Sequence, residues 1–398
     1  MMARREEREV VVVGAGPGGS ATAARLADAG HDVLLLDRAE FPRRKPCAEC
    51  VNPAGVQALR RLGAWDAVAA AAHARLDGWR IAAVGRGGFD GWYPDEVRGI
   101  GIPREVLDAI LVRHAADRGA EARTGLRVAD LLRDARGAVA GVRVHGTDGE
   151  REIGARLVVG ADGLRSVVLR RLGLLRRRPK LRKLALTAHV VGFGGVAGRG
   201  EVHVSGPGAC LGIAPVGGGV ANVTVVVPGG RADEVAGDAD GYFDAALERY
   251  GFGGLSRVDE VMATGPFDCP VRSAVADGAL LVGDAAGYYD PFTGQGIFRA
   301  LRGGELAAET AGAALRAGDT SARALAPYER ARRRAFGPGE RMQRVVEAFV
   351  SRPALLSAVA RRFTARPSLA DAVIRVTGDV SPAGSLFTPR FWAGLLWG

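Results

Sequence analysis

A glycine-rich loop between a strand and a helix constrains this chain more than any other feature of its sequence. Residues 14–19 read GAGPGG and directly follow the apolar, β-branched run Glu9–Val13, which predicts a buried strand of a parallel sheet. Gly14, Gly16 and Gly19 satisfy the pattern G-x-G-x-x-G. The first glycine permits a tight turn, the second lets the backbone approach a pyrophosphate, and the third permits close packing of helix on strand. The loop therefore predicts a dinucleotide site at a helix N-terminus, whose free N–H groups attract phosphate.

The residues after this loop complete a strand–helix–strand unit. A helix is expected over Gly18–Ala29 and a second strand over Asp32–Leu36, which is about the size of one βαβ unit. Asp37 ends the second strand, where a carboxylate can accept hydrogen bonds from ribose hydroxyls and repels a 2′-phosphate. We assign Asp37 and its neighbour Arg38 to the cofactor site.

A second glycine loop near residue 290 indicates which dinucleotide, NAD or FAD, the site binds. A short apolar strand, Ala279–Val282, delivers Asp284 near its carboxyl end, and residues 290–297, DPFTGQGI, then open a helix-like stretch. A dinucleotide with an extended middle, such as FAD with its ribityl chain, needs this second grip. We expect Asp284 to bind ribityl hydroxyls and the loop amides to bind the pyrimidine end of the flavin, while the helix dipole stabilises negative charge on the reduced ring. The residues of this loop assigned to the cofactor are Pro291, Gly294, Gly296 and Ile297.

Together these motifs resemble FAD-dependent oxidoreductases of the p-hydroxybenzoate-hydroxylase fold, most nearly the geranylgeranyl-reductase-like group. Residues 160–166, GADGLRS, are similar to the family's middle D-G motif, which implies that Asp162 lies near the FAD. Arg104, which opens an expected helix, is similar to the family's arginine at the ribityl–phosphate region. Residues 41–47, FPRRKPC, are similar to the segment that brings a cysteine, here Cys47, to the flavin in geranylgeranyl reductases.

Two departures from the geranylgeranyl-reductase pattern leave the substrate open. The cysteine of those enzymes is usually followed by two glycines, whereas Ala48, Glu49 and Cys50 follow Cys47 here. Their lipid pocket also carries a Y-x-W-x-F-P element, of which residues 210–215, CLGIAP, keep only the proline. The second departure argues against a geranylgeranyl chain as the substrate.

Cys47 and Glu49 are the candidate catalytic residues, with a solvated surface charge as the equally open interpretation of Glu49. The three cations that precede Cys47 favour its reactive thiolate, and the thiol is placed to protonate a reduced double bond. Two other roles stay open for Cys47, namely lining the flavin pocket and forming a redox pair with Cys50. There is no second C-x-x-C pair, so no metal site is expected. The histidines, including His189 and His203, read more readily as core or surface residues than as site residues.

The order of the expected elements indicates an α/β fold with an inserted, mixed β-sheet substrate domain and a helical C-terminal tail. The Rossmann-type FAD-binding domain is expected from three separated segments, 1–75, 100–175 and 270–325. Residues 76–99 and 176–269 form the expected β-rich substrate domain, and residues 326–398 the helical C-terminal region. Breaks in the last region are expected at Pro338, Pro353, Pro367 and Pro382.

The composition of the chain indicates which kinds of binding partner and which cellular location to expect. The net charge is +10, but the basic residues are scattered and lack interleaved aromatics, so no nucleic-acid partner is expected. Only four cysteines occur, which favours a reducing, cytoplasmic location without structural disulfides. The apolar stretch Phe391–Trp397 is expected to cover the pocket or to make an oligomer contact, with peripheral membrane contact as the weaker alternative. The oligomeric state stays open.

The sequence therefore predicts an FAD-dependent oxidoreductase that acts on a bulky, apolar substrate. We favour reduction of a carbon–carbon double bond in an isoprenoid or polyketide-like molecule, with NAD(P)H or another donor as a transient reductant. The alternative is a NAD(P)H- and oxygen-dependent monooxygenase that hydroxylates an aromatic or polyketide ring. A remote alternative is a lipid carrier without flavin chemistry, similar to Rab-escort proteins. The substrate is expected between Cys47, the strands around Trp79–Trp92 and the segment Leu211–Pro215.

Overall fold

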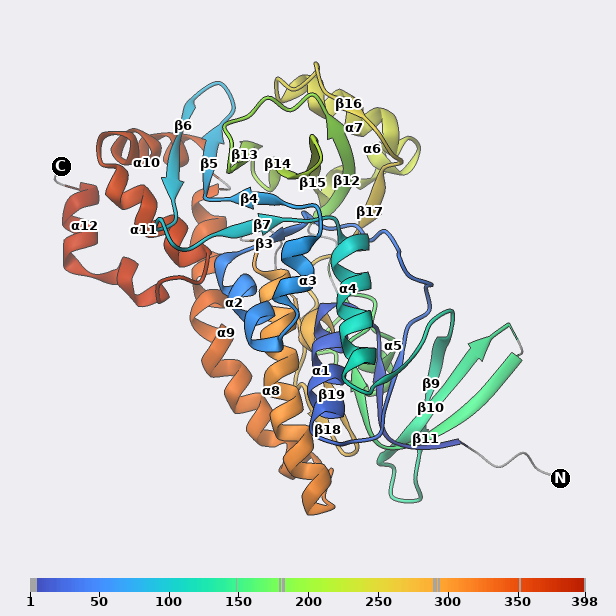
Figure 1. Ribbon diagram of the computed structural model, residues 1–398. Coiled ribbons are helices and arrows are strands. Elements are labelled where there is room, and N and C mark those ends of the chain that lie inside the picture. Colours follow the sequence, from blue (N-terminus) through green and yellow to red (C-terminus); the bar gives the residue numbers. More distant parts are fainter. Residues whose placement is uncertain are drawn as a thin grey trace.

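A parallel sheet forms the core of the part of the molecule that holds the N-terminal strand (Figure 1). The computed structural model describes residues 6–147, 149–178, 180, 183–288, 292, 294–350 and 352–396. Within these ranges eight strands form this sheet, of which six lie in the order β18 (Val275–Ala276), β19 (Ala279–Leu281), β11 (Gly149–Gly160), β1 (Glu6–Val13), β2 (Val33–Leu36) and β8 (Glu121–Arg123). The other two, β10 (Val139–Gly146) and β9 (Arg127–Arg133), continue from β11 as antiparallel partners.

The apolar run at the start of the chain becomes the buried middle of this sheet. Strand β1 pairs in parallel with both β11 and β2, and residues 10–12 are fully buried. A strand covered on both faces needs a continuous apolar run rather than an alternating one, which explains its valines. Val13 lies opposite Gly160 on one side and Leu36 on the other, so the three strands end at the same edge.

Helices pack closely around this sheet through glycines. The helices are α1 (Pro17–Asp28), α2 (Pro53–Leu62), α3 (Trp65–Ala70), α4 (Arg104–Asp117), α5 (Val167–Arg171) and α8 (Gly296–Ala317). Helix α1 packs against both α4 and α8. A Cβ on Gly304 of α8 would lie only 2.7 Å from the Gly18 carbonyl oxygen of α1. This close approach brings the two helices that begin at the two glycine loops side by side.

A second sheet, mixed in direction, stands above the first in Figure 1. Its strands run in the order β16 (Ser256–Arg257), β12 (Lys183–Val191), β15 (Val220–Pro228), β14 (Ala209–Gly217), β13 (Arg199–Gly206), β5 (Gly78–Ala83) and β6 (Gly87–Trp92), with β17 (Met262–Thr264) also paired to β12. The pair β13–β5 is parallel and the others are antiparallel. Helix α7 (Ala239–Arg249) follows the short helix α6 (Ala232–Ala236) and packs on one face, in an apolar cluster with β12, β14 and β15. A small sheet of β3 (Cys50–Val51), β7 (Gly99–Gly101) and β4 (Ala74–Leu76) completes the strands.

The C-terminal region is helical and packs on the second sheet. It consists of α9 (Ala322–Val350), α10 (Pro353–Ala365), α11 (Pro367–Thr377) and α12 (Pro389–Leu396). Helices α10 and α11 pack on β6, which confirms the expected helical tail. The break expected at Pro338 is wrong, because α9 continues through it. A proline removes only one helical N–H, and the buried side chains of Phe336 and Met342 on either side fix the helix by packing.

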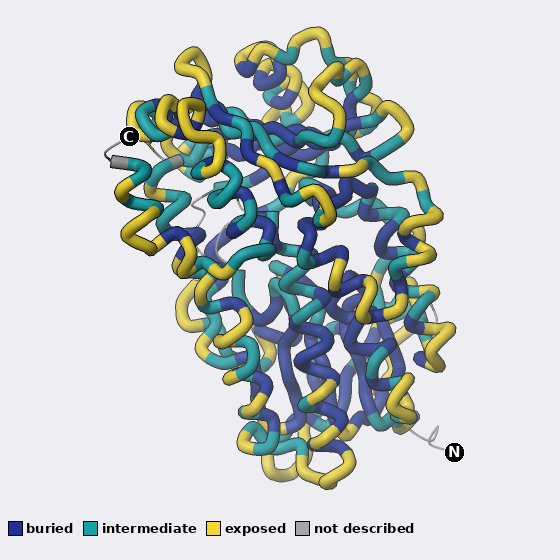
Figure 2. The backbone as a smooth tube through the Cα atoms, turned by 60° about the vertical axis from the view of Figure 1, so that its left-hand side comes forward, coloured by how far each residue is buried: buried dark blue, intermediate teal, exposed yellow. Residues whose placement is uncertain are grey.

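The molecule is an α/β protein with the architecture expected from the sequence. Figure 2 shows that the buried residues follow the strands of both sheets and the helices between them. Strands β5 and β6 join the sheet of β12–β15 although about a hundred residues of chain separate them. The domain boundaries given above stay a prediction.

Candidate active site

Four chain segments meet at one edge of the parallel sheet. Strands β1, β2, β11 and β19 are parallel neighbours, so the residues that follow them lie at the same edge. These residues are Gly14, Asp37, Asp162 and Asp284, each of which was assigned to the cofactor from the sequence. Ligands of open α/β sheets bind at the carboxyl ends of the strands. The fold therefore brings all three sequence motifs to one place.

The first glycine loop forms a cradle that side chains leave open. Gly14 has a φ of +100° and packs so tightly that a Cβ would lie 2.5 Å from the Ala161 carbonyl oxygen. A Cβ on Gly19 would lie 1.8 Å from the Gly14 carbonyl oxygen, so this position admits only glycine. A Cβ on Gly16, in contrast, would meet only guanidinium nitrogens, at 3.8 and 4.0 Å. The N-terminus of α1 and two arginines thus face an open space of the kind that a pyrophosphate fills.

Those two arginines, Arg43 and Arg104, are held by one buried carboxylate. Asp108 is fully buried and accepts hydrogen bonds from Arg104 Nε and Nη2 at 2.9 and 2.6 Å. It also forms an ion pair with Arg43 Nη1 at 2.9 Å. Burial disfavours the charged Arg104, but Asp108 outweighs that effect and raises the pKa of the guanidinium. Two fixed cations therefore share one anion, which leaves positive charge for a phosphate.

The carboxylates of the first and middle motifs bind mainly backbone amides. Asp37 accepts hydrogen bonds from the Ala15 and Ala39 amides at 2.8 and 2.9 Å, so it fixes the glycine loop, while its neighbour Arg38 is exposed. Asp162 Oδ2 accepts from the Val167 amide at 2.6 Å at the start of α5. Its other oxygen, Oδ1, is buried without a hydrogen-bond partner among the described residues, and burial raises the pKa of this carboxyl.

The second glycine loop is also open. Asp284 lies in the 3₁₀ turn Gly283–Ala286, and a Cβ on Gly294 or Gly296 would meet no atom within 4 Å. Gly296 is the first residue of α8, and Ile297 is buried behind it. Pro291 lies outside the described residues.

A half-buried lysine lies between the loops. Lys45 Nζ lies 3.5 Å from where a Cβ of Gly163 would be, in the middle motif. Burial, and next the charge of Arg104, lower the pKa of this lysine, whereas Asp284 opposes them. Two open glycine cradles, an unpartnered carboxylate oxygen and three cations fit FAD, whose pyrophosphate is negative and whose ribityl chain carries hydroxyl donors.

One carboxylate ties the second loop to the rest of the chain. Asp379 Oδ2 accepts hydrogen bonds from Gln295 Nε2 at 2.8 Å and from Asn52 Nδ2 at 2.9 Å. Burial raises the pKa of Asp379 to about 6, although both hydrogen bonds oppose this. The C-terminal region is therefore joined directly to the loop that was assigned to the flavin.

Cys47 lies beside a cation that its sequence neighbourhood did not indicate. Its Sγ accepts a hydrogen bond from the Glu49 amide at 3.4 Å and lies close enough to Arg104 to interact with the guanidinium. Arg44 instead binds Asp259 at 2.7 Å. The neighbouring Cys50 donates its thiol proton to the Ala48 carbonyl at 3.0 Å, and burial raises its pKa well above the ordinary value. All four cysteines are free.

Glu49 makes contacts that the sequence did not reveal. Its φ is +57°, a conformation that favours glycine, and its side chain is buried. Glu49 Oε1 accepts from the Arg104 amide at 2.8 Å, and Oε2 lies 2.7 Å from His189 Nε2. His189 Nδ1 in turn lies 2.6 Å from Asp259 Oδ2. The hydrogen bond with Glu49 is the main reason that the pKa of His189 is raised to about 9, so the imidazole is charged at neutral pH.

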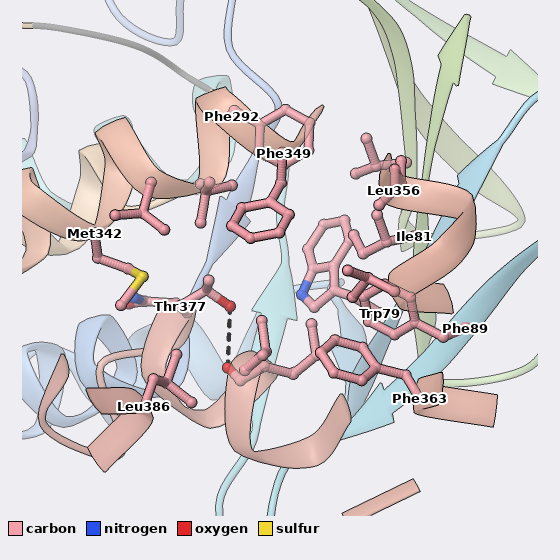
Figure 3. Close-up of a pocket in the computed structure, with 18 of the residues that line it drawn as sticks. Trp79, Ile81, Phe89, Phe292, Met342, Phe349, Leu356, Phe363, Thr377 and Leu386 are labelled. Atoms are coloured by element: carbon pink, nitrogen blue, oxygen red, sulfur yellow. Dashed lines mark hydrogen bonds between the residues drawn. The ribbon is translucent and has the colours of Figure 1, made fainter. Parts of the chain in front are cut away.

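An apolar cavity of about 180 Å³ opens next to these residues (Figure 3). Residues 50–52 and Gly294 line its end nearest the cofactor loops, and Trp79 and Phe89 come from the second sheet. Most of the remaining lining comes from the C-terminal helices, including Phe349, Phe363, Phe391 and Trp392. An apolar lining of this kind favours an apolar ligand over water.

The polar side chains of Thr377 and Asn52 in this cavity already have hydrogen-bond partners within the protein. The Thr377 hydroxyl donates to the Ile374 carbonyl at 3.1 Å, shown as the dashed line in Figure 3. The side-chain oxygen of Asn52 accepts from the Gly55 amide, while its nitrogen binds Asp379. The lining therefore offers a ligand mainly van der Waals contact.

The segment Leu211–Pro215, expected to line the substrate site, is absent from the described lining of this cavity. Strand alternation places Leu211 and Ile213 in the buried cluster beneath α7. Among the described residues no group of three or more His, Cys, Asp or Glu side chains could hold a metal ion. No described helix is long and apolar enough to cross a membrane.

Comparison with known proteins identifies the family. The model of the FAD binding domain matches residues 7–204. Digeranylgeranylglycerophospholipid reductase 2 of Methanopyrus kandleri is 34% identical in an alignment of 345 positions that covers 81% of this chain and 81% of that protein. Menaquinone reductase of Mycolicibacterium smegmatis is 32% identical in an alignment of 322 positions that covers 76% of this chain and 75% of that protein. The structure of a flavoprotein/dehydrogenase from Cytophaga hutchinsonii superposes with a TM-score of 0.81 at 20% identity, covering 97% of this chain and 95% of the other.

These matches agree with the two glycine cradles and with the cations between them. The protein is an FAD-dependent oxidoreductase of the p-hydroxybenzoate-hydroxylase fold, and it belongs to the family of the digeranylgeranylglycerophospholipid reductases.

Proposed function

We propose that this protein reduces carbon–carbon double bonds of a prenyl lipid whose chain lies in the apolar cavity. The observation that carries this proposal is the cavity itself, which begins at Cys50–Asn52 and Gly294 and continues between the C-terminal helices. A saturated or unsaturated hydrocarbon chain binds there through burial of apolar surface alone. The relatives named above are reductases of a geranylgeranyl lipid and of a prenylated quinone, which supports the same substrate class.

The chain's own residues supply binding, orientation and a proton. The cradle at Gly16, with Arg43 and Arg104, would hold the pyrophosphate of FAD, and the loop at Gly294 and Gly296 would hold its flavin end. Bound FAD, once reduced by NAD(P)H or another donor, supplies a hydride to one carbon of the double bond. Glu49 or Cys47 supplies the proton to the other carbon. Cys47 lies close enough to Arg104 to interact with its guanidinium.

The oxygen-dependent alternative has lost its main support. It rested on the aromatic element missing from residues 210–215, which suggested a pocket unsuited to a prenyl chain. Aromatic side chains instead line the cavity from other segments, namely Trp79, Phe89, Phe349, Phe363 and Phe391. A prenyl chain therefore finds an aromatic wall without that element.

Mass spectrometry tests this function. The FAD-loaded protein is reduced without air and incubated with a geranylgeranylated glycerophospholipid and, separately, with a menaquinone. Gain of two hydrogen atoms per double bond in either lipid supports the proposal. Gain of an oxygen atom when air is admitted, with no hydrogen gain before, would overturn it in favour of the monooxygenase.

A further inference from the structure

We propose that the C-terminal helices dock on the surface of an anionic lipid bilayer, with the opening of the apolar cavity facing the lipid. The inference goes beyond the proposed function, because docking on a bilayer can be measured whether or not the protein reduces a lipid. Two features of residues 352–396 carry it, namely the place where the cavity opens and the charge of the surface around that opening.

The cavity reaches the protein surface at Phe387. This side chain lines the cavity, yet it is 54% exposed, the largest exposed fraction of any large apolar side chain among the described residues. Residues 50–52 and Gly294 line the end nearest the cofactor loops. A lipid chain that enters at Phe387 therefore reaches those loops along an apolar lining.

One side of α10 carries both cavity-lining and exposed residues. Four side chains lie along this side, because they are spaced at i, i+4, i+7 and i+11: Leu355, Val359, Arg362 and Arg366. Val359 lines the cavity, whereas Leu355 is 39% exposed and the two arginines are exposed. On this side, the wall of the cavity thus continues into an exposed stripe of one apolar residue and two cations.

Helix α12 brings a third exposed arginine next to this stripe. Arg366 Nη1 donates to the Gly394 carbonyl at 3.2 Å, which joins the end of α10 to α12. Arg390 precedes Gly394 by one turn, so it lies on the same side of α12, and it follows Phe387 by three residues. Figure 1 shows α12 at the outer edge of the molecule. We define the docking patch by five exposed residues, namely Leu355, Arg362, Arg366, Phe387 and Arg390.

The surface around the docking patch carries cations without exposed carboxylates. Five arginines of residues 352–396 are exposed, namely Arg352, Arg361, Arg362, Arg366 and Arg390, and none of them forms an ion pair with a described residue. The stretch contains only two acidic residues, Asp371 and Asp379, and both are less exposed. Asp371 accepts a hydrogen bond from the Trp92 amide at 2.8 Å, and Asp379 binds Asn52 and Gln295. The positive charge of this surface is therefore left for an external anion.

An anionic bilayer fits the docking patch better than a second copy of the chain. In a two-fold symmetric dimer the same patch would face itself, so arginines would meet arginines with no exposed carboxylate between them. A bilayer instead offers anionic head groups to the arginines and an apolar interior to Phe387 and Leu355. It is also the phase that holds long-chain apolar ligands of the kind that the cavity fits.

Sedimentation with lipid vesicles tests the docking. The FAD-loaded protein is mixed with vesicles of phosphatidylcholine alone and with vesicles that also contain phosphatidylglycerol. We expect the protein to bind the second kind at least about 10-fold more tightly, because the arginines attract anionic head groups. This binding should weaken as the salt concentration rises, since salt screens exposed charges.

Two variants and a matched control locate the contact. Arg362→Gln combined with Arg390→Gln removes two arginines whose side chains make no hydrogen bond with a described residue, and it should weaken binding to the anionic vesicles roughly 5-fold per arginine. Phe387→Ser should weaken it roughly 10-fold through loss of apolar contact. The control combines Arg113→Gln with Arg330→Gln, since these arginines of α4 and α9 are also exposed and without an ion-pair partner among the described residues. The control should bind like the wild type.

Equal binding to both kinds of vesicle would overturn the proposal, as would wild-type affinity in the variant that lacks Arg362 and Arg390. Failure to bind vesicles, together with a dimer that dissociates in Phe387→Ser, would assign the docking patch to a contact between two copies of the chain. Docking without reduction of any lipid would overturn the proposed function and leave the docking intact. Reduction of dispersed lipid without docking would do the reverse.

Discussion

Substitution by alanine should have different effects at two glycines of the first loop: at Gly16 it should weaken FAD binding, and at Gly19 it should destabilise the fold. In Gly16→Ala the new methyl group would lie 3.8 Å from Arg104 Nη2 and 4.0 Å from Arg43 Nη2, which is ordinary contact. Gly16 has a φ of −76°, which any residue adopts, so the free protein should lose no more than about 1 kcal/mol from the weaker helix cap. The methyl would, however, occupy the space from which a phosphate oxygen reaches both guanidiniums. Loss of one or two charge-assisted hydrogen bonds amounts to about 3 kcal/mol, a roughly 100-fold weaker FAD affinity.

Gly19→Ala should instead damage the fold. Its Cβ would lie 1.8 Å from the Gly14 carbonyl oxygen, where contact requires about 3.4 Å. Both atoms belong to buried backbone, so the strain falls on β1 and α1 and should cost about 3 kcal/mol or more of the free energy of unfolding. Urea denaturation of the flavin-free protein and FAD titration by flavin fluorescence measure the two effects separately. Wild-type FAD affinity in Gly16→Ala, or wild-type stability in Gly19→Ala, would refute the reasoning.

Three further substitutions, the first with a matched control, probe the apolar cavity, the contact of α9 with the first sheet, and the second sheet. Val359→Trp fills the cavity from α10 and should abolish lipid reduction while FAD binding persists. The control, Ala354→Trp, lies on the exposed face of the same helix and should leave both lipid reduction and FAD binding unchanged. Lipid reduction by both variants would disprove the cavity as the lipid site. Tyr328→Phe removes a buried hydrogen bond of 2.8 Å to a carbonyl of β19 and should cost about 1 kcal/mol in urea denaturation, and no loss would contradict the value given to that bond. A hydrogen bond from His203 is the main reason that the pKa of Glu201 is lowered from 4.5 to about 2, so this carboxylate stabilises the fold above pH 4.5 and less as the pH falls towards 2. The stability difference between wild type and Glu201→Gln should therefore shrink over that interval, and a constant difference would show that the charge contributes nothing.

The cofactor site could be predicted because its signals are local. Gly14, Gly16, Asp37 and Asp284 each follow a strand within a few residues, and parallel strands must end at one edge. The order of the expected helices and strands along the chain was then enough to predict the α/β fold and the inserted mixed sheet.

The contacts of Glu49 and Cys47 could not be predicted, because they join distant parts of the chain. His189 meets Glu49 across 140 residues and Asp259 across 70, and no spacing rule links such positions. The contact between Cys47 and Arg104 likewise joins residues that are 57 positions apart.

The cavity could not be predicted from the sequence for a related reason. Apolar periodicity indicates that one face of a helix is buried, but not which element covers it. The C-terminal helices therefore read as a tail, although Phe349, Phe363 and Trp392 supply much of the lining. Residues 210–215 lack the aromatic side chains of the geranylgeranyl-reductase element, and aromatic side chains from other segments line the cavity.

The bond between Asp379 and two distant amides has a thermodynamic consequence. One oxygen of this carboxylate holds Gln295 of the flavin loop and Asn52 of the cavity wall at once. FAD bound at the Gln295 loop, or a lipid bound at the Asn52 wall, would restrict the motion of Asp379 and its two partners. The second ligand to bind would then lose less conformational entropy than the first. Cofactor and lipid should therefore bind with positive cooperativity, and linkage requires that each raise the affinity for the other by the same factor.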